Sequence, residues 1–227
     1  MPQGGPLRWA DGTGWLVLSG GGSIARGETD VVDAHILSIA NLDRPMVVLL
    51  SEGQQAEAEA VVDHYVALGG PVGEGFILAD MSPEDLEDPD FLSLIAEAGI
   101  LYLGGANPLF LARRLQKTAA LRAIVKGFAT LQGLLIVGAG GGAAALGAWV
   151  TDPAEPTVQA PGLNFLQSAI VTAHFTSTED ADALRTLLHE HPGFIGLGVP
   201  DGTALALGPE GEVVTWGAGE VTAVVHQ

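Results

Sequence analysis

A histidine and three glycine-rich turns are the residues of this sequence whose type and spacing could support chemistry. His174 ends a predicted strand at residues 169–175 and could act as a general base. The glycine turns follow apolar runs, at residues 20–22, 104–105 and 138–142. In an open α/β sheet, ligands bind beyond the carboxyl ends of the strands. A single such turn could be no more than a tight connection, but three together favour a site.

The turn at residues 138–142 has the frame of a nucleophile elbow. An apolar strand at 134–137 leads into it and small residues follow, as in a strand–turn–helix. An elbow reads Gly-x-Ser-x-Gly and exposes the central serine on a sharp turn. Here the central residue is Gly140, and residues 138–145 contain no Ser, Thr or Cys. The turn therefore lacks the side-chain nucleophile that acyl transfer by this route requires.

The first glycine turn also permits a different interpretation. Gly20, Gly22 and Ala25 match the dinucleotide fingerprint G-x-G-x-x-G/A, and Glu52 follows the second predicted strand, where an acid would bind a ribose. A second match lies at Gly138, Gly140 and Ala143. The pattern is weak in a chain with 32 glycines. Dinucleotide binding at residues 20–25 therefore stands as an alternative.

Other chemistry-bearing groups give little support to a metal or a cofactor. His189 and His191 are two residues apart, so they do not share a helix face. The chain has no cysteine, which excludes disulfides, thiol catalysis and thiolate metal sites. No pair of carboxylates stands out for glycoside hydrolysis. We expect no metal and no cofactor.

The elements that must position these residues alternate between short apolar strands and helical patterns. Strands are predicted at 15–18, 46–50, 75–78, 100–103 and 134–137, and helices at 29–42, 54–68, 108–117, 119–130 and 141–150, with a further helix starting at Ser82. This alternation predicts an α/β three-layer sandwich with a mostly parallel sheet.

The last third of the chain has a different pattern. Residues 151–163 carry three prolines and no period, which predicts a loop. A strand at 169–175 and a helix from Ser177 to about Glu190 come next. Short strands at 194–199, 203–207, 213–216 and 221–224 are joined by Asp-Gly and Glu-Gly turns. They predict an antiparallel meander at the C-terminal edge of the sheet.

Length and charge restrict the class of protein. The 227 residues suit one domain, 1–227, with residues 1–13 expected to be flexible. The net charge of −18 repels phosphate backbones, so nucleic acid is not an expected partner. No apolar stretch reaches the ~20 residues of a membrane span. No secretory signal is visible, so we expect a cytoplasmic protein without membrane contact.

The order of the motifs resembles the cyanophycinase and dipeptidase E (aspartyl dipeptidase) family of serine peptidases, which is peptidase S51-like. The glycine cluster after the first strand, the turn Gly104-Gly105-Ala106-Asn107 and the elbow occur in the family's order. Residues 162–175 and 196–205 look like the family's Gly-Leu … Asp-Gln-His-Phe and Gly-Ile-Gly-Ile-Asp-Glu-x-Thr-Ala. The resemblance spans about residues 15–215 and implies a class I glutamine amidotransferase-like fold.

The same resemblance implies a set of site residues. The family's triad falls on Gly140 at the nucleophile position, on His174 as base and on Asp201 as acid, with Pro200 in place of the preceding aspartate. Backbone N–H groups of Gly105 and Gly141 would be the oxyanion donors. The substrate-binding positions are Gly104 and Asn107.

Glycine at the nucleophile position predicts a member of this family that is inactive as a peptidase, a pseudoenzyme acting as a binding or scaffold protein. The resemblance also implies a small peptide or amino-acid-like ligand and a homodimer. One alternative is an active serine hydrolase on Asp-containing peptides, with Ser19, Ser23 or Ser51 as nucleophile and His174 as base.

Overall fold

A seven-stranded sheet lies at the centre of the computed structural model, which describes residues 6–130 and 133–225. Its strand order is β11-β10-β1-β5-β4-β2-β3. The five parallel strands are β1 (Leu16–Ser19), β2 (Met46–Leu50), β3 (Gly73–Ile77), β4 (Ile100–Gly104) and β5 (Leu135–Ala139). The antiparallel strands β10 (Thr203–Leu207) and β11 (Val213–Gly217) complete one edge.

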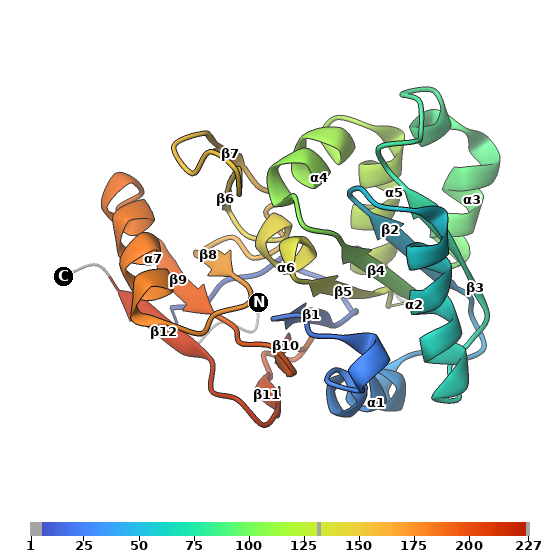
Figure 1. Cartoon of the computed structure of the whole chain (residues 1–227). Coiled ribbons are helices and arrows are strands. Elements are labelled where there is room, and N and C mark those ends of the chain that lie inside the picture. The colour runs from blue at the N-terminus through green and yellow to red at the C-terminus, as the bar shows by residue number, and fades with distance from the viewer. Residues whose placement is uncertain (1–5, 131–132, 226–227) are drawn as a thin grey trace.

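Helices cover both faces of this sheet, so the predicted three-layer α/β sandwich is confirmed (Figure 1). One face carries α1 (Asp30–Ile39) and α2 (Gln55–Ala67). The other carries α3 (Pro89–Glu97), α4 (Pro108–Leu115), α5 (Ala119–Ala129) and the short α6 (Gly141–Ala145). A hydrophobic cluster fills the space between each helical layer and the sheet.

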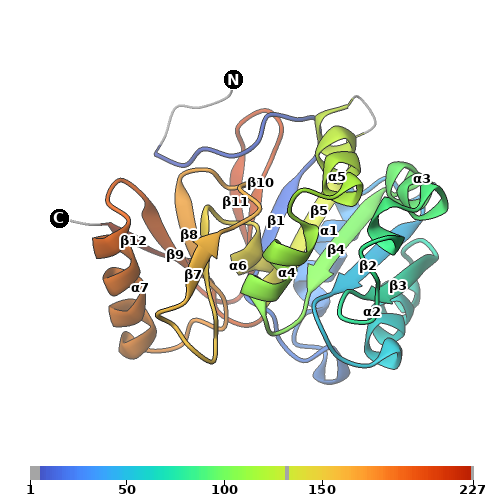
Figure 2. The ribbon, with the colours of Figure 1, turned by 90° about the horizontal axis from the view of Figure 1, so that it is seen from above.

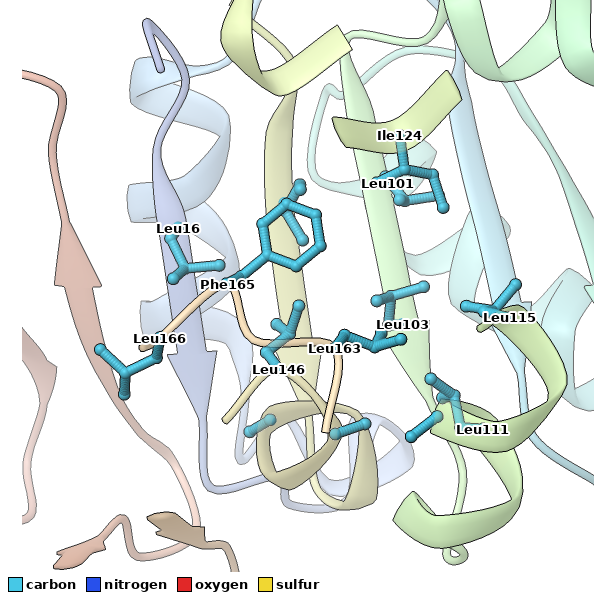
Figure 3. Close-up of a cluster of buried hydrophobic side chains, with 14 of the residues drawn as sticks. Leu16, Leu101, Leu103, Leu111, Leu115, Ile124, Leu146, Leu163, Phe165 and Leu166 are labelled. Atoms are coloured by element: carbon cyan, nitrogen blue, oxygen red, sulfur yellow. The ribbon is translucent and has the colours of Figure 1, made fainter. Parts of the chain in front are cut away.

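The inner parallel strands β1, β2, β4 and β5 read as continuous apolar runs because both of their faces are buried, whereas the edge strand β3 is partly exposed. Leu16 on β1 and Leu101 and Leu103 on β4 are fully buried under the α4–α5–α6 layer. Figure 3 shows Phe165 and Leu146 among these leucines. This packing fixes the strand ends, and so the turns that follow them, in one place.

A second, smaller sheet lies at one end of the molecule, beside α7 (Thr178–Glu190) (Figure 2). Its strands are β8 (Ala169–Thr172), β9 (Ile195–Gly198) and β12 (Thr222–Val225), in the order β12-β9-β8. The helix α7 connects β8 to β9 as a crossover, so these two strands run parallel. The predicted four-strand meander is therefore divided: β10 and β11 extend the main sheet, whereas β9 and β12 belong to the small one.

The largest differences from the predicted boundaries occur at three elements. Residues 151–163 contain part of a hairpin, β6 (Trp149–Thr151) and β7 (Gln159–Pro161), rather than only a loop. The helix expected from Ser82 begins at Pro89, because Asp88 caps it by accepting from the N–H of Asp90 at 2.9 Å, and a 3-10 turn, η2 (Asp85–Glu87), precedes it. The helix after the elbow ends at Ala145 instead of residue 150.

The N-terminal segment is described from Pro6 onward, and residues 1–5 of the segment expected to be flexible lie outside the described residues. Trp9 is buried and forms a bridge with Leu166, and the N–H of Ala10 donates to the carbonyl of Phe165 at 2.7 Å. Leu7, Trp9 and Ala10 thus pack against the core. Across 6–130 and 133–225, no helix combines the length and the apolar character needed to cross a bilayer.

Candidate functional site

The side chains of His174 and Asp201 form a hydrogen-bonded pair. His174 follows β8, Asp201 lies in the turn between β9 and β10, and Nδ1 of His174 is 2.6 Å from Oδ1 of Asp201. A carboxylate at Nδ1 holds the proton on that nitrogen and leaves the lone pair on Nε2. The side chains are 62% and 47% exposed, so the pair is open to solvent and to small molecules.

The glycine turn after β1 hydrogen-bonds to the backbone of His174 and of Gly202, the residue after Asp201. The N–H of His174 donates to the carbonyl of Gly20 at 3.1 Å, and the N–H of Gly202 donates to that of Gly21 at 2.9 Å. A Cβ on Gly21 would lie 2.6 Å from Cε1 of His174, so only glycine fits there. His174 itself has φ +53°, a left-handed conformation that costs a non-glycine residue about 1–3 kcal/mol. The surrounding backbone bonds therefore hold the histidine in a strained but defined position.

Gly140 lies directly opposite Nε2 of His174. It follows β5, its N–H donates to the carbonyl of Ser19 at 3.1 Å, and its backbone angles are φ +57° and ψ −121°. An ideal Cβ built on Gly140 would be 3.1 Å from Nε2 of His174. A side chain at this position would therefore point at the basic nitrogen of the pair.

Gly105 and Gly141 were expected to offer two free N–H groups to an oxyanion, and one of these groups is hydrogen-bonded within the protein. The N–H of Gly141 donates to the carbonyl of Gly105 at 3.1 Å, so it is already occupied. Gly105 has φ +103°, and a Cβ there would overlap Oγ of Ser51 at 2.1 Å. The expectation that Gly105 and Gly141 both offer N–H groups to a ligand is not met at Gly141 in this structure, because the two turns hydrogen-bond to each other.

The two expected substrate-binding positions have structural partners. Gly104 is buried at the end of β4, and its carbonyl accepts from the N–H of Ser51 at 2.9 Å. Oδ1 of Asn107 accepts from the N–H of Phe110 at 2.8 Å and caps α4. The amide nitrogen of Asn107 carries two further donors, since only its oxygen is used by the cap. Of these two positions, only Asn107 has a side chain that could contact a ligand.

Two of the three alternative serine nucleophiles, Ser19 and Ser51, are hydrogen-bonded away from His174. Ser19 and Ser51 are buried, and their hydroxyl oxygens accept from the N–H groups of Gly21 at 3.3 Å and Asn107 at 3.4 Å. Ser23 precedes a 3-10 turn, η1 (Ile24–Arg26). Within the described part of the chain, no hydroxyl group hydrogen-bonds to His174. The geometry therefore gives no support to an alternative serine.

The glycines of the dinucleotide-like turn are explained by packing. A Cβ on Gly20 would lie 2.1 Å from the carbonyl oxygen of Pro200. The N–H of Ser23 donates to the carboxylate of Glu28 at 2.7 Å, so an acid occupies a donor that a phosphate would need. Oε1 of Glu52 accepts from the N–H of Ala106 at 3.1 Å instead of facing a ribose site. These contacts remove the reason to infer a nucleotide.

One ion pair beside the site was missed in the sequence. Arg26 binds Glu28 with Nε and Oε1 2.8 Å apart. The hydrogen bond from Arg26 and the one from the N–H of Ser23 lower the pKa of the Glu28 carboxyl. The same pair raises the pKa of Arg26, with a smaller contribution from the charge of Asp201. In the sequence, only the position of these two residues directly after the glycine turn pointed to this ion pair.

Over the described ranges, no three His, Cys, Asp or Glu side chains could hold a metal ion.

Comparison with known proteins gives a consistent picture. The sequence model of peptidase family S51 matches residues 15–213. A peptidase from an acI-B1 Actinobacterium has a TM-score of 0.61 at 20% identity, covering 95% of this chain and 99% of that chain. A putative peptidase E protein from Listeria monocytogenes EGD-e has a TM-score of 0.64 at 18% identity, covering 91% and 99%. No curated protein sequence matches the chain.

Proposed function

This chain belongs to peptidase family S51, and we propose that it is a non-catalytic member that binds a small peptide or amino-acid-like ligand at the His174–Asp201 pair. The observation that carries this proposal is Gly140. Its backbone has positive φ at the sharp turn from β5 into α6, and an ideal Cβ there would be 3.1 Å from Nε2 of His174. The base is in place, but the oxygen that it would activate is absent.

Glycine is an understandable replacement at this position. A residue with a side chain is strained at φ +57°, whereas glycine adopts such angles freely. Loss of the serine would therefore relieve strain without disturbing β5 or the turn. The hydrogen bond between Gly141 and Gly105 points the same way, because it occupies a donor that peptide hydrolysis would need for the oxyanion.

Polar groups remain available for a ligand. The exposed His174 offers Nε2, the exposed Asp201 offers its second carboxylate oxygen, and Asn107 offers its amide nitrogen. These groups lie beyond the carboxyl ends of β8, β9 and β4, which is where open α/β sheets bind ligands. An acceptor and a carboxylate at the His174–Asp201 pair, with a donor on the turn that follows β4, suit the amine and carboxyl groups of a small peptide.

The proposal is tested with Asp-X and β-aspartyl dipeptides on the purified protein. Product formation followed by chromatography should stay at the buffer background, while thermal unfolding should shift upward in the presence of a bound dipeptide, because a ligand stabilises the state that it binds. His174→Ala should abolish that shift. The matched control His35→Ala changes an exposed histidine on α1 and should leave the shift unchanged.

Two results would contradict this function. Hydrolysis above background that depends on His174 would show an active hydrolase with another nucleophile. A thermal shift that is equal in wild type and in His174→Ala would place the ligand elsewhere. If no dipeptide changes the unfolding temperature, the proposed small-peptide ligand is contradicted and only a scaffold role is left.

A further inference from the structure

A groove with an apolar floor lies at the carboxyl end of β3, between this strand and α3. Its volume is about 650 Å³, within the range of sites that bind ligands. Phe76, Ile77, Met81, Phe91 and Leu94 form the floor, and the rings of Phe76 and Phe91 meet edge to face with centroids 5.2 Å apart. We call this feature the β3–α3 groove. Figure 1 shows β3 and α3 together at one end of the molecule.

The rim of the β3–α3 groove is uniformly acidic. It carries six carboxylates and, among its lining residues, no Lys, Arg or His: Glu74, Asp80, Asp85, Asp88, Asp90 and Glu97. Two of them have structural roles, because Asp85 accepts from the N–H of Ser82 and Asp88 caps α3. The other four carboxylates have no hydrogen bond or ion pair within residues 6–130 and 133–225. These four carboxylates are exposed and therefore accessible to a cationic occupant.

A single metal ion does not fit this arrangement. A bound divalent cation needs several oxygen ligands that converge on one point. No group of three carboxylates or other ligating side chains in the described part of the chain has that geometry. The charges are spread around an apolar floor, so the complementary occupant is extended and combines several positive charges with apolar side chains.

The acidic surface continues across the edge strand. A smaller hollow of about 260 Å³ shares Gln55 and Glu74 with the β3–α3 groove and adds Glu59 and Asp63 of α2. Because β3 is the last strand of the main sheet, both hollows lie along an open sheet edge. Two adjoining hollows along one edge strand suit an extended polypeptide segment better than a compact ligand.

We propose that the β3–α3 groove is a docking site for an extended basic segment of a partner protein. Lys or Arg side chains of the segment pair with Asp80, Asp90 and Glu97, and its intervening apolar side chains lie on Phe76 and Leu94. The site is separate from the His174–Asp201 pair, since β3 is three strand positions from β5, or about 14 Å. It does not depend on the function proposed for that pair.

Fluorescence anisotropy with a labelled, end-blocked peptide of alternating Arg and Leu tests this site. The wild-type chain should bind it saturably, and binding should weaken as salt is raised above about 0.15 M. The triple variant Asp80→Asn/Asp90→Asn/Glu97→Gln should weaken binding by about 10-fold or more. Leu94→Gln should also weaken it, because this change removes part of the apolar floor.

A charge-matched control separates this site from general attraction to an acidic protein. Asp43→Asn/Glu155→Gln/Glu220→Gln removes the same charge from exposed acids outside the groove and should change binding less than about 2-fold. Equal weakening by the two triple variants would overturn the proposal, as would the absence of saturable binding by wild type. A peptide of alternating Arg and Gly that binds as tightly as the Arg-Leu peptide would show a site for simple polycations and would also overturn it. Thermal unfolding checks that each variant is folded.

Discussion

At residue 140 the backbone turns sharply from β5 into α6 without a side chain. Gly140 has φ +57° and ψ −121°, angles that glycine adopts without cost and other residues adopt only under strain. On the opposite side, His174 also has positive φ but keeps its side chain and its bond to Asp201. The strain that remains at His174 is therefore the stronger indication that this place in the fold has a function.

A single substitution tests the backbone at this position. Gly140→Ala should lower the free energy of unfolding by about 1–3 kcal/mol, because alanine is disfavoured at these angles and its Cβ would contact Nε2 of His174. Urea denaturation measures the change. Gly127→Ala, in α5 and without positive φ, places its Cβ 3.3 Å from Cδ2 of Leu134, a side-chain end that can shift, and should change the free energy of unfolding by less than about 1 kcal/mol. Equal effects of the two variants would contradict the assignment.

At the scale of elements, a buried polar cluster connects α1 to α2. Asp33 is 4% exposed, and its carboxylate accepts from the hydroxyl of Tyr65 at 2.6 Å and lies 2.8 Å from Nε2 of His64. Burial and the charge of Asp33 hold the pKa of Tyr65 well above its usual range, so the phenol stays protonated and can donate. The cluster joins the two helices that cover one face of the sheet.

Tyr65→Phe removes that donor while preserving the ring. It should destabilise the fold by about 1–3 kcal/mol, because the Asp33 carboxylate would lose a hydrogen bond inside the protein. Chemical denaturation measures the loss. Tyr102→Phe is the matched control, since no hydrogen bond of the Tyr102 hydroxyl occurs in the described residues. A loss as large in Tyr102→Phe as in Tyr65→Phe would exclude this role of the Asp33 bond.

The first turn of α7 makes the stability of that helix depend on pH. Backbone N–H groups of Thr176 and Ser177 and the hydroxyl of Ser177 lower the pKa of the Asp180 carboxyl in the folded protein. The resulting stabilisation is complete above the ordinary Asp pKa of about 3.9 and is lost as the pH falls through the lowered pKa. Asp180→Asn should therefore destabilise the fold at neutral pH but have progressively less effect in acid. Thermal unfolding across this range measures the difference, and a difference independent of pH would contradict the role of the charge.

The sequence alone was sufficient to predict the elements that are built from long apolar runs. Four of the five parallel strands, β1, β2, β4 and β5, have buried faces on both sides, so their composition alone identifies them. The β6–β7 hairpin was missed because its two strands have three residues each and the segment contains prolines. The division of the last strands between two sheets was missed because local patterns do not encode which edge a strand joins.

The candidate site was likewise predicted only in part from the sequence. His174 was found from its place at a strand end, and the resemblance led to Asp201 and Gly140. Three-dimensional structure was needed to show that Nδ1 of His174 meets Asp201 and that Gly141 bonds to Gly105. These contacts join residues far apart in the sequence, so no spacing rule could predict them.

At the scale of the whole molecule, the net charge of −18 acts against self-association. The family resemblance nevertheless leads us to propose a cytoplasmic homodimer. Light scattering should then give about twice the monomer mass of 23.2 kDa, with the dimer favoured as added salt screens the charge. A monomer mass at every salt concentration would contradict the dimer, and recovery in the membrane or secreted fraction of cells would contradict the location.

The central claim is that the oxygen that His174 would activate is missing at residue 140, and labelling by a serine-directed fluorophosphonate probe tests it most directly. The wild-type chain should not be labelled. Gly140→Ser should be labelled, because its Oγ would lie beside Nε2 of His174, and Gly140→Ser/His174→Ala should lose the label. Labelling of any serine in the wild-type chain, or of Gly140→Ser at the same rate with and without His174, would contradict the account.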